Sequence, residues 1–201
     1  MIFIVGHHDT GKSTLARFLV DNGFLHVETG DIVRGIFRSS GTGLPFGEWA
    51  KQNGHHFDDH IIDSVNRAKD QALRENKQDV VITGNRQLEG IRQIRQSVEP
   101  LEQRKHLIVY MEADSEILFQ RHQHRNDRRV QDLTIESFKR DILGYDKEMG
   151  VERIREEADL VLCNNCNILG LYSCFSSRFK AYGYQLNPPL EGQDYCPMRR
   201  K

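Results

Sequence analysis

The feature that most constrains the fold is the opening stretch MIFIVGHHDTGKST. A short apolar run ends at Gly6, and a Gly-Lys-Ser sequence begins at Gly11. A buried strand that leads through this spacing into a helix is the context of a phosphate-binding loop (P-loop). Its glycines let backbone N–H groups turn toward a phosphate, and the helix N-terminus adds a favourable dipole. The sequence therefore predicts a nucleotide-binding α/β protein.

Within the loop, we expect Lys12 to reach the β and γ phosphates of ATP and the Ser13 hydroxyl to ligate Mg²⁺. The residues predicted to contact the nucleotide are Gly6, Asp9, Thr10, Gly11, Lys12, Ser13 and Thr14. His7, His8 and Asp9 are bulky for such a loop. They either point away from the phosphates or approach the transferred phosphate or its acceptor. Because a polyphosphate repels a carboxylate that no arginine pairs, we expect Asp9 to point outward.

Five apolar runs alternate with segments of helical periodicity. The runs cover residues 2–5, 24–27, 79–83, 106–111 and 159–162. Most lack strict alternation, as expected for strands that are covered on both faces. Repeated strand, helix, strand units predict a parallel sheet with right-handed crossovers.

Composition limits the remaining possibilities. With 201 residues, we expect one domain over 1–186 and an extended or disordered tail over 187–201. The formal net charge of −1 gives no reason to expect nucleic acid or a membrane surface as a partner. No apolar run is long enough to span a bilayer or serve as a signal peptide, so we expect a cytoplasmic protein, of unassigned oligomeric state.

Two further motifs follow predicted strands. In ETGDIVR (28–34), Thr29 and Arg34 are candidates to bind an acceptor's phosphate, with Asp31 beside the metal; the alternative is simple capping of a helix. In VVITGNRQ (80–87), Gly84 lets the backbone approach a ligand and Arg86 is a candidate phosphate clamp; the alternative is a surface ion pair.

The short, charged segment 122–134 is predicted to be a lid. Arg121, Arg125 and Arg128 lie in or beside it, where arginines can neutralise charge that develops during phosphoryl transfer. The alternative is a solvated charged surface. The candidate catalytic residues are Lys12, Asp31, Arg86, Arg121, Arg125 and Arg128.

An acceptor-binding region is expected over about 29–78. It includes His55, His56 and His60, for which a solvated helix start is a simpler interpretation than a metal site.

These residues resemble the nucleoside monophosphate kinases of the adenylate kinase type. Thr29-Gly30-Asp31-x-x-Arg34 is similar to the segment that holds the acceptor's phosphate, and Gly84-x-Arg86 is similar to the Gly-Phe-Pro-Arg element, without its proline. Arg121 and Arg125 resemble the lid arginines. The resemblance implies a three-layer α/β/α P-loop NTPase fold with a five-stranded parallel sheet in the order 2-3-1-4-5. It also implies ATP and Mg²⁺ as cofactors and direct phosphoryl transfer.

A longer likeness, over about residues 1–170, is to the archaeal dephospho-CoA kinase-like nucleotide kinases. TIESFKRD (134–141) and EADLVLCNN (157–165) resemble their later motifs, which implies that Asn164 and Asn165 lie in the loop near the donor adenine. Where that family has an aspartate at the end of the third strand, this chain has Thr83, so Asp31 is expected to serve the metal alone.

The acceptor is the open question. An acceptor phosphate needs only positioning, whereas an acceptor hydroxyl needs a general base. Two arginines aimed at one acceptor favour a nucleoside or deoxynucleoside monophosphate. The alternatives are a small-molecule hydroxyl kinase with Asp31 as base, and a regulatory nucleotide-binding module with slow turnover.

Overall fold

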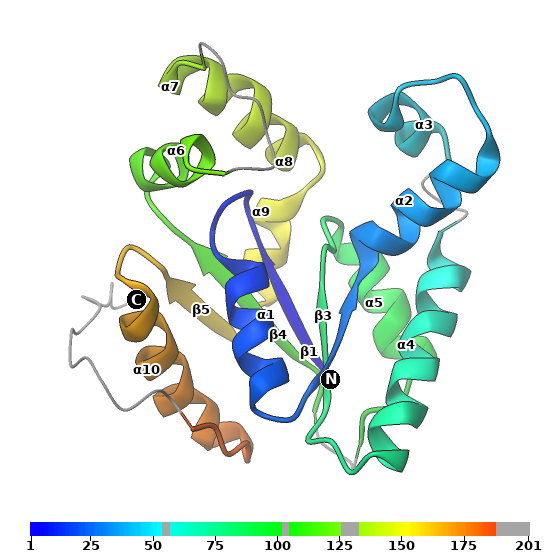
Figure 1. Ribbon diagram of the computed structural model, residues 1–201, viewed down its shortest axis with the longest axis vertical. Helices are drawn as coiled ribbons and strands as arrows, with labels where there is room; N and C mark the ends of the chain where they lie inside the picture. The colour runs from blue at the N-terminus through cyan, green and yellow to red at the C-terminus, as the bar shows by residue number, and fades with distance from the viewer. Residues whose placement is uncertain (54–56, 102–104, 126–132, 188–201) are drawn as a thin grey trace.

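The computed structural model describes residues 1–53, 57–101, 105–125 and 133–187. Its centre is a parallel sheet of five strands in the order β2-β3-β1-β4-β5, which confirms the predicted order (Figure 1). The strands are β1 (Ile2–Gly6), β2 (Leu25–Glu28), β3 (Val80–Thr83), β4 (Leu107–Glu112) and β5 (Leu160–Cys163). Each lies within one residue of the predicted run at both ends. Arg128 and residues 188–201 of the predicted tail fall outside the described residues.

Helices cover both faces of the sheet, which makes the three predicted layers (Figure 1). Along β1, Ile2 and Ile4 face one core while Phe3 and Val5 face the other, because successive side chains of a strand point to opposite faces. The first core is closed by α1 (Lys12–Asp21) and α10 (Ile168–Phe179). The second is closed by α4 (Asp58–Arg74), α5 (Leu88–Ser97) and α9 (Val151–Ile154).

Two groups of helices flank the edge where the parallel strands end. On one side are α2 (Thr29–Ser40) and α3 (Phe46–Asn53), which hold together through Phe37, Phe46 and Trp49. On the other side are α6 (Ser115–Gln123), α7 (Ile135–Ser137), a π-helical segment (Phe138–Leu143) and α8 (Gly144–Glu148). The loops after the strands therefore meet between these two groups, as ligand sites of open parallel sheets do (Figure 1).

None of the helices described is long and apolar enough to cross a membrane.

Candidate active site

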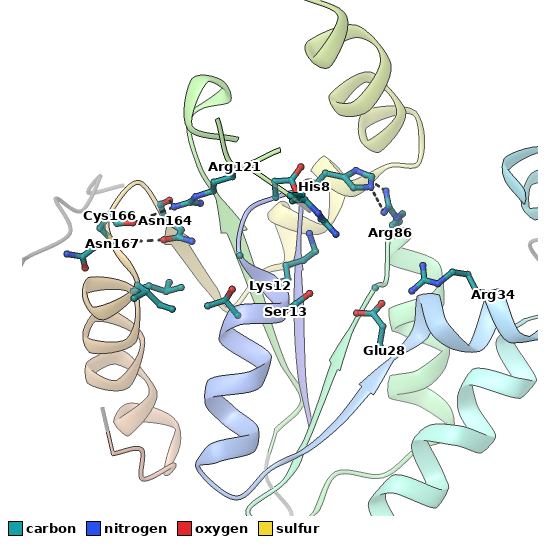
Figure 2. A pocket seen from close by; sticks show the side chains of 17 residues that line it. His8, Lys12, Ser13, Glu28, Arg34, Arg86, Arg121, Asn164, Cys166 and Asn167 are labelled. Carbon is teal, nitrogen blue, oxygen red and sulfur yellow. Dashed lines mark hydrogen bonds and ion pairs between the residues drawn. The ribbon is translucent and has the colours of Figure 1, made fainter. Parts of the chain in front are cut away.

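A pocket of about 650 Å³ lies at the carboxyl edge of the sheet, next to the P-loop (Figure 2). The predicted site residues that line it are Asp9, Gly11, Lys12, Ser13, Thr14, Arg34, Gly84, Arg86, Arg121, Arg125 and Asn164. The lining residues that sequence reasoning did not assign to the site are His8, Glu28, Cys166, Asn167, Ile168 and Leu171. Residues from all three predicted motifs and the described start of the lid thus surround one cavity.

The P-loop has the backbone shape that its glycines predict. Gly6 and Gly11 have φ values of 148° and 94°, and a Cβ on Gly6 would overlap the carbonyl oxygen of Met111. Lys12 Nζ folds back on the loop, donating to the carbonyl oxygens of Gly6 at 2.9 Å and His7 at 2.5 Å. Burial lowers the pKa of Lys12 to about 8. Because carbonyl oxygens are neutral, an anionic phosphate would be a stronger partner for this lysine.

The expectation that Asp9 points outward is wrong. Its side chain is 2% exposed and accepts hydrogen bonds from His122 Nδ1 at 2.7 Å and from Arg125 Nη1 at 2.9 Å. Burial alone would raise the pKa of Asp9, but hydrogen bonds from Arg125 and His122 outweigh it and lower the pKa. Arg125, just beyond the end of α6, pairs with the carboxylate, and His122 within α6 hydrogen-bonds to it, so the carboxylate can remain buried. Asp9 thereby links the P-loop to residues 122–125, the described start of the segment predicted to be a lid.

His8 is anchored on the opposite side of the loop. Its Nδ1 lies 2.9 Å from the carboxylate of Asp146, and its Nε2 lies 2.8 Å from Arg86 Nη2. Arg86 also forms an ion pair with Asp146. Burial lowers the pKa of His8, although its hydrogen bond to Asp146 acts the other way. Arg86 is therefore in an ion pair, which was the alternative to a phosphate clamp. This ion pair is not simply a surface one, because Arg86 lines the pocket and its carboxylate partner is buried.

Asp31 does not occupy the position predicted for a metal ligand or base. Its side chain is 73% exposed, pairs with Arg34 at 2.7 Å, and is not among the residues that line the pocket. The physical reason is helical geometry, because Asp31 and Arg34 are three residues apart on α2 and meet on its surface. Thr29 is 3% exposed and likewise absent from the lining. Gly6 and Thr10 belong to the P-loop but are not among the residues that line the pocket.

Glu28 is the carboxylate that the sequence analysis missed. It ends β2, lines the pocket, and caps α2 by accepting from the backbone N–H of Gly30 at 3.2 Å. Its register partner on β3 is Thr83, whose hydroxyl donates to Glu28 Oε2 at 2.5 Å. Gly84 leaves space for this arrangement, because a Cβ there would overlap Glu28 Oε1. A carboxylate on β2 therefore lies beside the end of β3, where it is held by Thr83.

At the other end of the pocket, an arginine and apolar side chains line the same cavity. Arg121 Nη2 donates to the carbonyl oxygen of Asn164 at 2.9 Å, while its Nη1 is buried without a hydrogen-bond partner among the described residues. Asn164 itself is buried and donates to the carbonyl oxygen of Thr10 at 2.8 Å. Ile168, 51% exposed, and Leu171 line the same end. A cationic plane beside aliphatic side chains suits a planar base.

Among the residues that the structure describes, no group of three or more His, Cys, Asp or Glu side chains is arranged to hold a metal ion. His55 and His56 lie outside the described residues.

Comparison with known proteins gives one family and one fold. Residues 2–144, more than half of the chain, match the AAA domain family. A sugar kinase from Janibacter sp. HTCC2649 is similar in structure with a TM-score of 0.58 and 12% identity, over 89% of this chain and 93% of that one. Shikimate kinase from Bacteroides thetaiotaomicron gives 0.57 and 13%, over 91% and 98%. A gluconokinase from Sinorhizobium meliloti 1021 gives 0.53 and 14%, over 85% of each. No curated protein matches the chain.

Proposed function

This chain belongs to the AAA domain family and has the fold of P-loop kinases, and from this premise we propose that it transfers the γ-phosphate of ATP to a small-molecule acceptor. The observation that carries the proposal is that one pocket contains both a P-loop and a separate pair of arginines. Lys12, Ser13 and Arg121 line the donor half, and Arg34 and Arg86 line the half beyond Glu28 (Figure 2). A nucleotide-binding module with no acceptor has little use for the second pair.

The donor half suits ATP. Its phosphates would receive hydrogen bonds from the P-loop N–H groups and replace the carbonyl oxygens that now bind Lys12. Its base would lie between Arg121 and the apolar surface of Ile168 and Leu171, near Asn164.

The residues present also suit Mg²⁺. Ser13 and Glu28 bring a hydroxyl and a carboxylate, the hard oxygen donors that this ion prefers, to the same pocket. When bound, the ion would neutralise charge on the β and γ phosphates. Glu28 takes the place that the sequence analysis gave to Asp31.

For the acceptor, we favour a nucleoside or deoxynucleoside monophosphate. An acceptor phosphate is already anionic and needs cationic positioning, which Arg34 and Arg86 can supply from two sides. Arg125 stands at the lid side, where it can stabilise the transferred phosphoryl group.

The test is ADP release, measured by a coupled assay with each nucleoside and deoxynucleoside monophosphate in turn. We expect at least one to stimulate ADP release, Lys12→Ala to abolish it, and Arg86→Ala to lower kcat/KM for the acceptor about tenfold or more. Arg92→Ala is the matched control, because Arg92 pairs with Glu157 and is absent from the pocket lining. Nucleotide binding with no acceptor-stimulated ADP would refute the monophosphate kinase and favour a regulatory module.

A second candidate, a hydroxyl kinase, is favoured by one specific observation. Glu28 is a carboxylate on the acceptor side of the P-loop, where it can take a proton from a hydroxyl. The panel therefore includes sugars, hydroxy acids and dephospho-CoA. In this case Glu28→Gln would lower kcat by at least a hundredfold at saturating Mg²⁺, because a base is lost. If Glu28 serves only the metal, raising Mg²⁺ would restore much of the rate.

A further inference from the structure

Asp146 is a buried carboxylate to which the proposed function has given no role. It lies on α8, and its side chain is 1% exposed. It accepts from the backbone N–H of His8 at 2.6 Å, from the ring of His8 at 2.9 Å, and from Arg86. Burying a carboxylate is costly unless it is paired and hydrogen-bonded, and here the partners come from the P-loop and from the segment after β3.

The hydrogen bonds fix the protonation of His8. An arginine can only donate, so Nε2 of His8 accepts from Arg86 Nη2 at 2.8 Å. A neutral imidazole then carries its proton on Nδ1 and donates it to Asp146 at 2.9 Å. The 3.4 Å approach of Arg86 Nη1 to Nδ1 is consequently a contact and not a hydrogen bond. The side chains of Asp146, His8 and Arg86 therefore form a closed arrangement, here called the positioning ring, in which each is hydrogen-bonded to the other two.

This ring orients the guanidinium of Arg86. Of its five N–H groups, one faces Asp146 and one faces His8, which leaves three for a ligand. The ring of Tyr145, the neighbour of Asp146 on α8, lies 5.6 Å from the guanidinium carbon. Arg86 remains 34% exposed and lines the pocket, so part of this side chain is accessible to an anion there. A guanidinium already held in place loses little entropy when it binds.

We infer that Asp146 is a positioning residue that fixes Arg86, the acceptor-side arginine, to the donor-side P-loop through His8. The inference rests on the proposed function in that Arg86 binds the acceptor. One buried carboxylate thereby sets the separation of the two halves of the pocket, and in-line phosphoryl transfer depends on that separation. This positioning role also explains why His8 occupies the variable part of the P-loop, since a small residue there could not bridge Asp146 and Arg86.

The test is a double-mutant cycle on acceptor kinetics, with whichever acceptor the ADP-release panel identifies. Asp146→Asn removes the charge at constant size, and we expect kcat/KM for the acceptor to fall at least tenfold. In the Arg86→Ala background the same change should lower it less than twofold, because the residue acts through Arg86. Glu157→Gln breaks the Arg92–Glu157 ion pair outside the pocket and should change the kinetics less than twofold. Equal losses from Asp146→Asn in both backgrounds, or no loss in either, would overturn the inference.

Two further measurements keep the test decisive. If Asp146→Asn does not fold, His8→Gln replaces it in the double-mutant cycle. This variant removes the imidazole of His8 but keeps the backbone N–H that donates to Asp146. If no acceptor is found, the proposed function fails while the ring can still be examined by ¹⁵N NMR of His8 at pH 7. The Nδ1–H tautomer in the wild-type protein, together with a higher His8 pKa in Arg86→Ala because the facing guanidinium is lost, supports the positioning ring. An Nε2–H tautomer in the wild-type protein overturns it.

Discussion

The pH dependence of nucleotide affinity follows directly from the state of Lys12. Burial lowers the pKa of Lys12 to about 8, so the lysine is mostly charged at pH 7 and mostly neutral at pH 9. A bound polyphosphate favours the charged form, and binding above pH 8 therefore requires uptake of a proton. With about a tenth of the lysine still protonated at pH 9, we expect ADP affinity to fall about tenfold from pH 7 to pH 9.

The assay is isothermal titration calorimetry with ADP at pH 7, 8 and 9, in buffers of different ionisation enthalpy, so that proton uptake is counted as well. Unfolding does not account for the loss. Between pH 8 and 10.5 the unfolded chain binds the Lys12 proton more tightly than the folded one, so this group makes folding more favourable as the pH rises. Lys12→Arg does not titrate and should lose the dependence, while Cys166→Ser controls for the thiol in the pocket lining. An ADP affinity that is constant from pH 7 to 9 in the wild-type protein would contradict the proposed role of the Lys12 charge.

Three other predictions concern single residues. Gly84→Ala should lower the free energy of unfolding, measured by urea titration, by about 2 kcal/mol or more, because φ is +91° and the new Cβ overlaps Glu28. Gly43→Ala is the control: no atom lies near its new Cβ, and the free energy of unfolding should change by less than about 0.5 kcal/mol. Arg121→Ala should raise the Kd for ADP about tenfold while acceptor KM stays within twofold, and equal effects on both substrates would contradict its place beside the donor base. Burial lowers the pKa of His106 to about 4, so the folded protein should lose about 2 kcal/mol as the pH falls from 7 to 4.5, and His106→Leu should lose less over that range.

The fold could be predicted because its signals are local. Each strand is a short β-rich apolar run, and the spacing from Gly6 to Ser13 has one common structural context. The P-loop, Arg34, Arg86 and Arg121 were found for the same reason, since each stands at a strand end or beside a motif.

The site predictions that failed depend on contacts between residues far apart in the chain, which local sequence patterns do not reveal. Asp146 reaches His8 across 138 residues and Arg86 across 60, from a short helix without any motif. Asp9 was misplaced because its partner His122 is 113 residues away. Glu28 was overlooked in favour of Asp31, although it is the last residue of a strand and such positions face the ligand edge of a parallel sheet. That positional rule could have found it.

We propose that one pocket binds a donor and an acceptor and moves phosphate between them. The most direct test is to incubate the protein with ATP labelled on the γ-phosphate and the acceptor panel, and to identify the labelled product. We expect a phosphorylated acceptor whose formation requires both Lys12 and Arg86 and is unaffected by Arg92→Ala. Label found only in inorganic phosphate, at a rate that no acceptor changes, would contradict it.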